Sequence, residues 1–247
     1  MKLYFIRHGQ SQNNANWGKA GYQESSDPPL TEIGREQARL LAEFLGRSQE
    51  LRASPGWDAA NRYGFGITHL YCSLMERAVH TASPIAQALQ VPFAAWPDIH
   101  ETGGIFSREA TNRFTGLPGK PRSYFEQNAP GLSLPDDLDE TGWWKRPFET
   151  DEQRQPSADR FLSALLERHG DRDGHPEDCV ALVSHGGFFM HLMCAMLQLP
   201  WQQAAHNLHS WFLLSNCSIS RFDISATNLT ICYLNRTDYL PDHLVTG

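Results

Sequence analysis

Four short polar groups follow apolar stretches of the sequence, and their residue types suit the binding and transfer of anions. Arg7, His8 and Gly9 come directly after the apolar run 2–6. The other groups are the segment 73–77, which ends in Arg77, the pair His100 and Glu101, and His185 with the two glycines after it. Charged and titratable side chains are costly beside buried strands unless they have partners. These groups are therefore candidates for one shared site.

The combination of arginine, histidine and glycine favours a phosphate site. Arg77 falls in the first turn of an expected helix, where the helix dipole disfavours a cation by a few tenths to ~1 kcal/mol. An anion bound there would explain the arginine. The glycines after His185 allow close backbone approach, and the helix that follows offers unpaired N–H groups. Two arginines, two histidines and a helix N-terminus predict phosphate rather than carboxylate.

Phosphoryl transfer at such a site needs a nucleophile, positive charge and a proton donor. A neutral imidazole is a competent nucleophile near pH 7. The arginines and the second histidine would neutralise charge on the equatorial oxygens of the transferred group. Glu101 is the carboxylate that the strand ends bring to this edge, and such acid–base help is worth roughly 10²–10⁴-fold.

The elements that must carry these residues alternate between strand and helix. Apolar runs predict buried strands at 2–6, 67–72, 91–96 and 179–184. Helical spacing of apolar residues follows at 31–46, 73–89, 157–170 and 187–199. This alternation predicts an α/β sheet with helices on both faces. Ligands of such sheets bind outside the carboxyl ends of the strands, which is where all four polar groups fall.

Several helix ends are also readable. Thr31 is expected to cap the first long helix and Gly46 to end it. Ser73 with Glu76 three residues later has the form of a capping box. Pro84 is expected to kink or split the helix that follows.

Residues 102–155 combine many glycines and prolines with little periodicity, and they are too long for a plain loop. We expect residues 1–247 to form a single domain in which 102–155 is an inserted cap with short helices over the site. Trp143 and Trp144 favour a small core of the cap over a stacking surface for substrate. Further on, residues 225–228 predict a hairpin turn.

Composition narrows the class of protein. The chain has 247 residues, of which 40% are hydrophobic and 20% charged, as in globular domains. A formal charge of -7 argues against nucleic-acid partners. Five scattered cysteines without a CxxC pair favour reduced thiols in the cytoplasm. We expect no signal peptide, because the apolar run at 1–6 is too short and leads directly into Arg7. We expect no membrane span, because glycines and histidines interrupt the longest apolar stretch, 179–201.

At this point the sequence resembles the histidine phosphatase superfamily, also called the phosphoglycerate-mutase-like family. The matching segments are RHGQSQNN at 7–14, DPPLTEIGREQA at 27–38, CSLMERAVHTA at 72–82, HE at 100–101, VSHGGF at 183–188 and SNCSISRF at 215–222. The resemblance implies a three-layer α/β/α sandwich with a mostly parallel central sheet. It also implies a phosphohistidine mechanism without a metal or other cofactor.

The resemblance assigns a role to each matching residue. It makes His8 the acceptor of the phosphoryl group. The other implied residues are Arg7, Arg77 and His185 in the phosphate pocket, Asn14 and Gly186 as further phosphate contacts, and Glu101 as the proton donor. The expected activity is that of a phosphomonoesterase of the histidine acid phosphatase type. Its substrate would be a phosphorylated small molecule or a phosphoprotein, and the oligomeric state is not readable.

Other readings stay open beside this one. The segment HETGGIF at 100–106 matches neither the NERxYG-like signature of the family's mutases nor the ExxxGxWEG of many bacterial phosphatases. This favours hydrolysis over a phosphoglycerate-type mutase or a silent phosphate-binding regulatory module. Glu109 or another cap carboxylate could replace Glu101. His8, His100, Glu101 and His185 have the residue types of a metal site, but the two arginines beside them and the absence of HExxH and HxH spacings oppose it.

Overall fold

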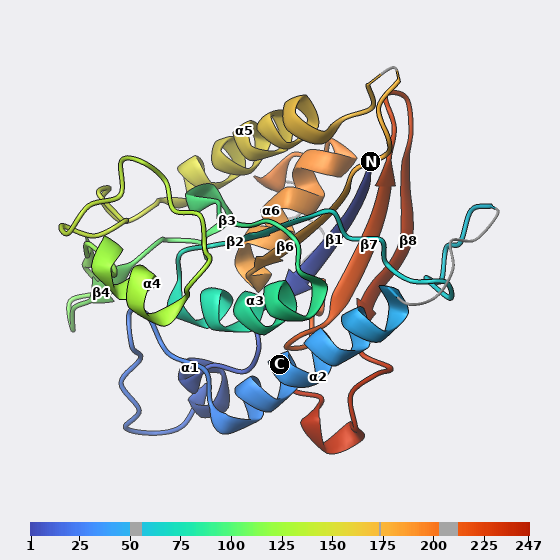
Figure 1. Cartoon of the computed structure of the whole chain (residues 1–247). Helices are drawn as coiled ribbons and strands as arrows, with labels where there is room; N and C mark the ends of the chain where they lie inside the picture. Colours follow the sequence, from blue (N-terminus) through green and yellow to red (C-terminus); the bar gives the residue numbers. More distant parts are fainter. Residues whose placement is uncertain (50–55, 173, 203–211) are drawn as a thin grey trace.

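The structure is a computed structural model that describes residues 1–49, 56–172, 174–202 and 212–247. Its centre is a six-stranded sheet in the order β3-β2-β6-β1-β7-β8 (Figure 1). The strands are β1 Lys2–Arg7, β2 His69–Cys72, β3 Phe93–Ala95, β6 Cys179–Ser184, β7 Ile219–Ile224 and β8 Leu229–Arg236. β1, β2, β3 and β6 run parallel, whereas β7 pairs antiparallel with β1 and with β8. The predicted mostly parallel sheet is confirmed.

Helices cover both faces of the sheet. One face carries α2 Glu32–Gln49 and α3 Glu76–Leu89, and the other carries α5 Asp151–His169 and α6 Gly186–Leu197 (Figure 1). Side chains of β1 alternate between the two layers: Tyr4 and Ile6 join the cluster under α2 and α3, while Leu3 and Phe5 join the cluster under α5 and α6. The three-layer α/β/α arrangement is therefore confirmed.

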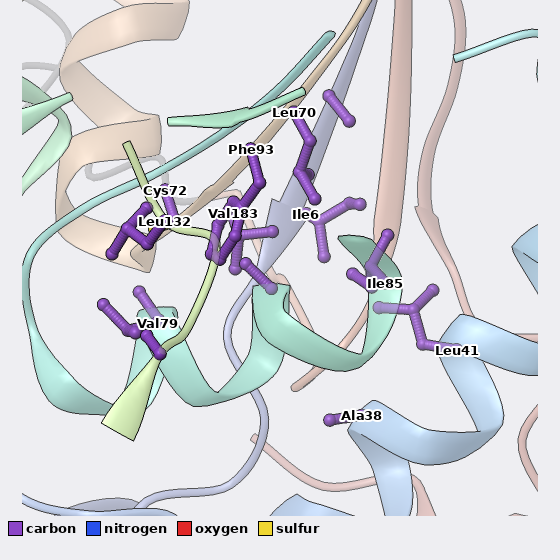
Figure 2. Close-up of a cluster of buried hydrophobic side chains, with 14 of the residues drawn as sticks. Ile6, Ala38, Leu41, Leu70, Cys72, Val79, Ile85, Phe93, Leu132 and Val183 are labelled. Atoms are coloured by element: carbon purple, nitrogen blue, oxygen red, sulfur yellow. The ribbon is translucent and has the colours of Figure 1, made fainter. Parts of the chain in front are cut away.

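The core under α2 and α3 shows why these two helices lie together. Leu41 of α2 and Ile85 of α3 are fully buried, and they pack with Ile6 of β1 in one apolar cluster (Figure 2). On each helix the buried apolar residues recur every three or four positions, as do Ala38 and Leu41 of α2 and Ala82 and Ile85 of α3, so they lie on one face. The helix positions are thus fixed by burial of that face.

The start of α2 is as predicted, but its end is not. The Thr31 hydroxyl accepts a hydrogen bond from the N–H of Gly34 at 3.0 Å, which confirms the cap. Gly46 does not end the helix, because α2 continues to Gln49. A Cβ on Gly46 would lie 3.6 Å from the Cβ of Ala88, so the glycine lies at the α2–α3 contact. A glycine inside a helix carries the usual cost in backbone entropy.

The start of α3 differs from the predicted capping box. Met75 is the N-cap, and its side chain makes no capping bond. The carboxylate of Asp27, from the loop before α2, accepts from the N–H of Glu76 at 3.0 Å instead. Ser73 is outside the helix. Pro84 does not split α3, which runs on to Leu89 as one helix.

Residues 102–155 contain a two-stranded antiparallel sheet, β4 Phe106–Arg108 and β5 Phe114–Gly116, and one short helix, α4 Arg122–Asn128. The expected short helices are thus one helix and a hairpin. α5 begins at Asp151, inside the expected insertion, because Thr150 and Gln153 form a capping box there. That these residues act as a cap over the site stays a prediction.

Trp143 and Trp144 attach this segment to the rest of the protein. Both are buried in the cluster under α2 and α3. The Trp144 ring meets His100 edge-on, with ring centroids 4.6 Å apart. It also lies against Gly104, where the φ of +75° and the lack of space both require glycine. The pair belongs to the main core, so it forms neither a separate cap core nor a stacking surface.

Three further helical segments within the described ranges are short: α1 Gln12–Asn16, η1 Pro97–Ile99 and η3 Asp242–Leu244. The helix α1 was not predicted, because its five residues are too few to show periodicity. The hairpin turn at 225–228 is confirmed by the bond from the Ser225 N–H to the Asn228 carbonyl at 2.9 Å. Within the described residues, no helix combines the length and apolarity that a membrane span requires.

Candidate active site

The carboxyl ends of β1 and β6 bring two histidines together. Arg7 and Ser184 are paired across these parallel strands, so the next residue of each chain segment lies at the same edge. The ring centroids of His8 and His185 are 5.0 Å apart. One nitrogen of each ring and one carboxylate oxygen of Glu101 all lie within 4.8 Å of one another. The predicted convergence of these side chains is therefore present.

His8 is held in the form that a nucleophile requires. The imidazole is 2% exposed, and its Nδ1 lies 2.7 Å from the carbonyl oxygen of Gly9. Because that carbonyl can only accept, Nδ1 carries the proton and Nε2 keeps its lone pair. The Nε–H of Arg77 donates to this Nε2 at 3.1 Å. Burial, followed by the charges of Arg77 and Arg7, holds the pKa of His8 well below its ordinary value.

The main chain around His8 is fixed by close packing. The N–H of Gly9 donates to the hydroxyl of Thr81 at 3.0 Å. A Cβ on Gly9 would lie 2.6 Å from the carbonyl oxygen of Gly34, which leaves room for glycine alone. The Asn216 amide donates to the carbonyl of His8 at 3.0 Å. The loop after β1 is thus held by α2, α3 and the segment before β7.

Arg77 provides a buried positive charge beside His8. It is 6% exposed, and its Nη1 lies 3.8 Å from Oδ1 of Asp27. Arg77 and Asp27 therefore form a buried ion pair, not a salt bridge at the surface. Burial raises the pKa of the Asp27 carboxyl to about 6, although Arg77 acts in the opposite direction.

Arg7 adds the second guanidinium. Its Nη1 donates to the carbonyl of Leu214, and its Nε is buried without a partner among the described residues. A Cβ on Gly186 would lie 3.8 Å from this Nε. Gly186 and Gly187 open α6, so their N–H groups have no intrahelical acceptor. Guanidinium and helix amides therefore face the same point, as expected for anion binding.

His185 is the N-cap residue of α6, and its ring is fully buried. The ring Nε2 lies 2.6 Å from the hydroxyl of Ser73. Its Nδ1 is buried and has no hydrogen-bond partner among the described residues. Burial, followed by the charge of Arg77, holds the pKa of His185 well below its ordinary value. The ring is therefore neutral at pH 7.

Glu101 stands at the side of this cluster. Its Oε1 accepts from the N–H of Thr102 at 3.0 Å. A Cβ on Gly187 would overlap this carboxylate, so the glycine creates the space that it occupies above the α6 N-terminus. Glu109, the alternative acid, is exposed and accepts a bond from Thr111 in its own turn. Glu109 does not line the pocket described below, whereas Glu101 does.

Asn14 is connected to His8 by hydrogen bonds through one intervening residue, Asn216. Its Oδ1 accepts from the N–H of Ser11 at 3.1 Å and from the Asn216 amide at 3.2 Å. The bond to Ser11 caps α1. The oxygen of Asn14 is therefore used inside the protein, and its contact with phosphate stays a prediction.

A pocket of about 870 Å³ opens above Arg77 and Glu101. One wall is the segment after α1, which includes Lys19 and Tyr22. The opposite wall includes Phe106 and Arg108 of β4. The remaining lining is rich in amides and hydroxyls, from Asn13, Asn16, Gln23, Ser25, Ser26, Thr102 and Ser107. Trp143 and Trp144 are not among the lining residues.

Sequence reasoning missed three residues that hold the site. These are Ser73, Thr81 and Asn216, which contact His185, Gly9 and His8. Thr81 could have been found, because it lies four residues after Arg77 on the same helix face. The other two contacts join segments that are distant in sequence, and no spacing indicates them.

Among the described residues, two groups of side chains have the residue types of a metal site. Around His8, the guanidiniums of Arg7 and Arg77 disfavour a cation. The second group, His69, His169 and Asp178, lies at the opposite end of β2 and β6. There Tyr71 and Asp178 bond the two nitrogens of His169, and Arg172 pairs with Asp178. The two nitrogens of His169 and the carboxylate of Asp178 therefore already have hydrogen-bond or ion-pair partners within the protein.

Comparison with known proteins agrees with this geometry. The sequence profile of the histidine phosphatase superfamily, branch 1, matches residues 3–55 and 58–237. A relative from Photorhabdus laumondii named "Probable phosphoglycerate mutase GpmB" is 28% identical over 226 residues, which cover 90% of this chain and 85% of that protein. The protein of that name from Yersinia pestis is 28% identical over 224 residues, with coverage of 90% and 85%.

Solved structures share the fold across nearly the whole chain. The alpha-ribazole phosphatase of Shigella flexneri is similar with a TM-score of 0.57 and 21% identity, covering 96% of each chain. A mycobacterial glucosyl-3-phosphoglycerate phosphatase in complex with VO3 has a TM-score of 0.57 and 20% identity, covering 96% of this chain and 99% of its own. With a family profile matched over almost its full length, this chain belongs to the histidine phosphatase superfamily.

Proposed function

We propose that this protein is a metal-independent phosphomonoesterase that works through a phosphohistidine on His8. The observation that carries the proposal is the state of His8, a buried neutral imidazole whose Nε2 lone pair faces a guanidinium. In the first step Nε2 attacks phosphorus, the P–O bond to the leaving group breaks, and the leaving oxygen takes a proton from Glu101. In the second step Glu101 accepts a proton from water, which attacks the phosphohistidine and releases inorganic phosphate.

The surrounding groups support the charge that develops on the phosphoryl oxygens. Arg7, Arg77, the Nδ1 of His185 and the N–H of Gly186 surround the position that these oxygens would take. Such fixed donors act strongly in a water-poor site, because they need no reorganisation during the reaction. Asn14 is proposed as a weaker contact through its amide nitrogen, because its Oδ1 already accepts bonds within the protein.

The proposed substrate is a small phosphorylated molecule with a polar leaving group. A pocket of about 870 Å³ exceeds what a phosphate alone needs, and its lining is mostly polar. The names of two structural relatives, an alpha-ribazole phosphatase and a glucosyl-3-phosphoglycerate phosphatase, also point to small molecules. We propose further that residues 102–155 form the cap that selects the leaving group, since Phe106 and Arg108 line the pocket.

Phosphoglycerate mutase activity is the second candidate, because it is named in the curated relatives. A mutase keeps its phosphohistidine long enough to return the group to substrate. Release of inorganic phosphate from phosphoglycerate faster than its isomerisation supports the phosphatase, and the reverse supports the mutase.

The five cysteines are all unpaired, and we propose a reducing, cytoplasmic location.

Glu101→Gln tests the two-step mechanism. We expect kcat for alkyl phosphates to fall roughly 10²–10⁴-fold. An aryl phosphate, whose leaving group needs no proton, should still phosphorylate the variant and leave it trapped as phosphohistidine. Glu109→Gln is the matched control and should behave as wild type. Equal losses on alkyl and aryl substrates, without a trapped intermediate, would assign the acid to another residue.

A further inference from the structure

Ser73 and His185 form a buried contact that the phosphatase mechanism described above does not use. Both side chains are completely buried, and the Ser73 hydroxyl lies 2.6 Å from Nε2 of His185. Ser73 follows β2 and His185 follows β6, and these strands are neighbours in register. The contact therefore joins two strand ends across the floor of the site.

The hydrogen-bond partners of Ser73 decide the direction of this bond. The Ser73 oxygen already accepts from the N–H of Met75 at 3.3 Å. Among the described residues, its hydroxyl proton has no acceptor other than Nε2 of His185. If Nε2 carried a proton, the hydroxyl proton would be buried without a partner, which costs about 1–3 kcal/mol. The favoured arrangement has the hydroxyl donating to Nε2.

The other nitrogen of His185 agrees with this direction. When Nε2 accepts, the proton of the neutral ring lies on Nδ1. Nδ1 is the buried nitrogen without a partner among the described residues, so its N–H remains available for a phosphoryl oxygen. In the opposite tautomer, Nδ1 would present a lone pair to an anion. That contact would be repulsive instead of attractive.

We propose that Ser73 is a positioning residue that selects the Nδ1–H tautomer of His185, so that a neutral imidazole donates to the transferred phosphoryl group. The proposal rests on the proposed phosphatase function. The selection is electrostatic and independent of the neighbouring arginines: Arg7 and Arg77 supply charge, whereas Ser73 supplies the direction of one hydrogen bond. The bond to His185 also explains why the Ser73 hydroxyl does not cap α3.

The direct test is the ¹⁵N spectrum of histidine-labelled wild-type protein at pH 7.5, with the His185 signals assigned by comparison with His185→Gln. We expect Nδ1 of His185 to be protonated and Nε2 to be unprotonated. In Ser73→Ala the ring should populate both tautomers. This measurement needs no substrate, so it reports on Ser73 even if the protein releases no phosphate.

Kinetics give the second readout. Ser73→Ala should lower kcat by about 10- to 100-fold and weaken vanadate binding in parallel, with a smaller change in KM. Ser73→Thr keeps the hydroxyl and should recover most of the activity. Ser218→Ala is the control, because it removes a buried serine hydroxyl that has no partner among the described residues. It should retain wild-type kinetics.

The possible outcomes distinguish the role of Ser73 from the proposed phosphatase function. An Nε2–H tautomer in the wild type, or an unchanged kcat in Ser73→Ala, overturns the role of Ser73 and leaves the phosphatase standing. An Nδ1–H tautomer in a protein that forms no phosphohistidine overturns the function instead. If Ser73→Ala does not fold, the wild-type spectrum and Ser73→Thr still decide.

Discussion

At the scale of single residues, two contacts determine the state of His8, and one of them, Arg77, would also stabilise the reaction. Its Nδ1 proton is held by the Gly9 carbonyl and its Nε2 faces Arg77. The sequence predicts these side chains at one edge, because strand ends converge in parallel sheets. It does not predict the ring orientation, which depends on one main-chain carbonyl and one distant guanidinium.

We predict that Asp27, which places a carboxylate beside Arg77, lowers the free energy of unfolding at neutral pH. Its folded pKa of about 6 exceeds its ordinary 3.8, so the folded protein binds more protons than the unfolded chain between these values. Stability from this group is therefore lost as pH rises through that window. Asp27→Asn should raise the free energy of unfolding at pH 7 by roughly 1–3 kcal/mol, measured in urea.

The same substitution should change phosphate binding. Without the carboxylate 3.8 Å from Arg77, the site is more positive, so inorganic phosphate should inhibit several-fold more strongly. Asp98→Asn, in an exposed pair with Arg146, should change neither quantity. An Asp27→Asn variant that is less stable at pH 7 would contradict this account.

At the scale of elements, α2 shows what could be read from the sequence and what could not. Its apolar face and the Thr31 cap were predicted, since both depend on local spacing. Its C-terminal end was not, because Gly46 serves a contact with α3 that no local pattern reveals. Gly34, at the other end, lies against the backbone of Gln10 and holds the loop that carries His8.

Two glycine-to-alanine changes on α2 should have opposite signs. Gly46→Ala places a methyl group 3.6 Å from Ala88, an ordinary contact, and should stabilise the fold by about 0.5–1 kcal/mol. Gly34→Ala forces a Cβ onto the main chain of Gln10, so it should destabilise the fold and lower kcat. Urea titrations and phosphate release measure both. A stabilising Gly34→Ala would show that the loop adapts.

At the scale of the whole molecule, two features explain most of what the sequence could not predict. The lack of periodicity distinguishes residues 102–155 from the rest of the chain, but the packing of Trp143 and Trp144 in the main core is a tertiary contact that no local pattern predicts. Ser73 was misread as a cap because its real partner, His185, is 112 residues away in sequence. Convergence of strand ends was predictable, whereas the partners of each side chain were not.

Buried neutral histidines should make the whole fold sensitive to acid. Burial lowers the pKa of several of them, namely His8, His100, His169, His185 and His191. Because the unfolded chain takes up these protons near pH 6.5 and the folded chain does not, stability should fall as pH decreases below 6.5. For His191, with a folded pKa of about 4, the window runs from 6.5 to 4.

Urea midpoints at pH 7.5, 6.5 and 5.5 measure this effect. His191→Gln should reduce the slope by up to about 1.4 kcal/mol per pH unit, the value for one proton. His175→Gln, at an exposed position, is the control and should leave the slope unchanged. A midpoint that stays constant down to pH 5.5 would mean that these histidines are protonated in the folded state.

The central claim is that His8 carries the phosphoryl group. Wild-type protein mixed briefly with a radiolabelled phosphomonoester, denatured under alkaline conditions and digested, should yield one acid-labile phosphopeptide that contains His8. The variant His8→Asn should show neither label nor phosphate release. Label on another residue, or turnover by His8→Asn at the wild-type rate, would contradict the account.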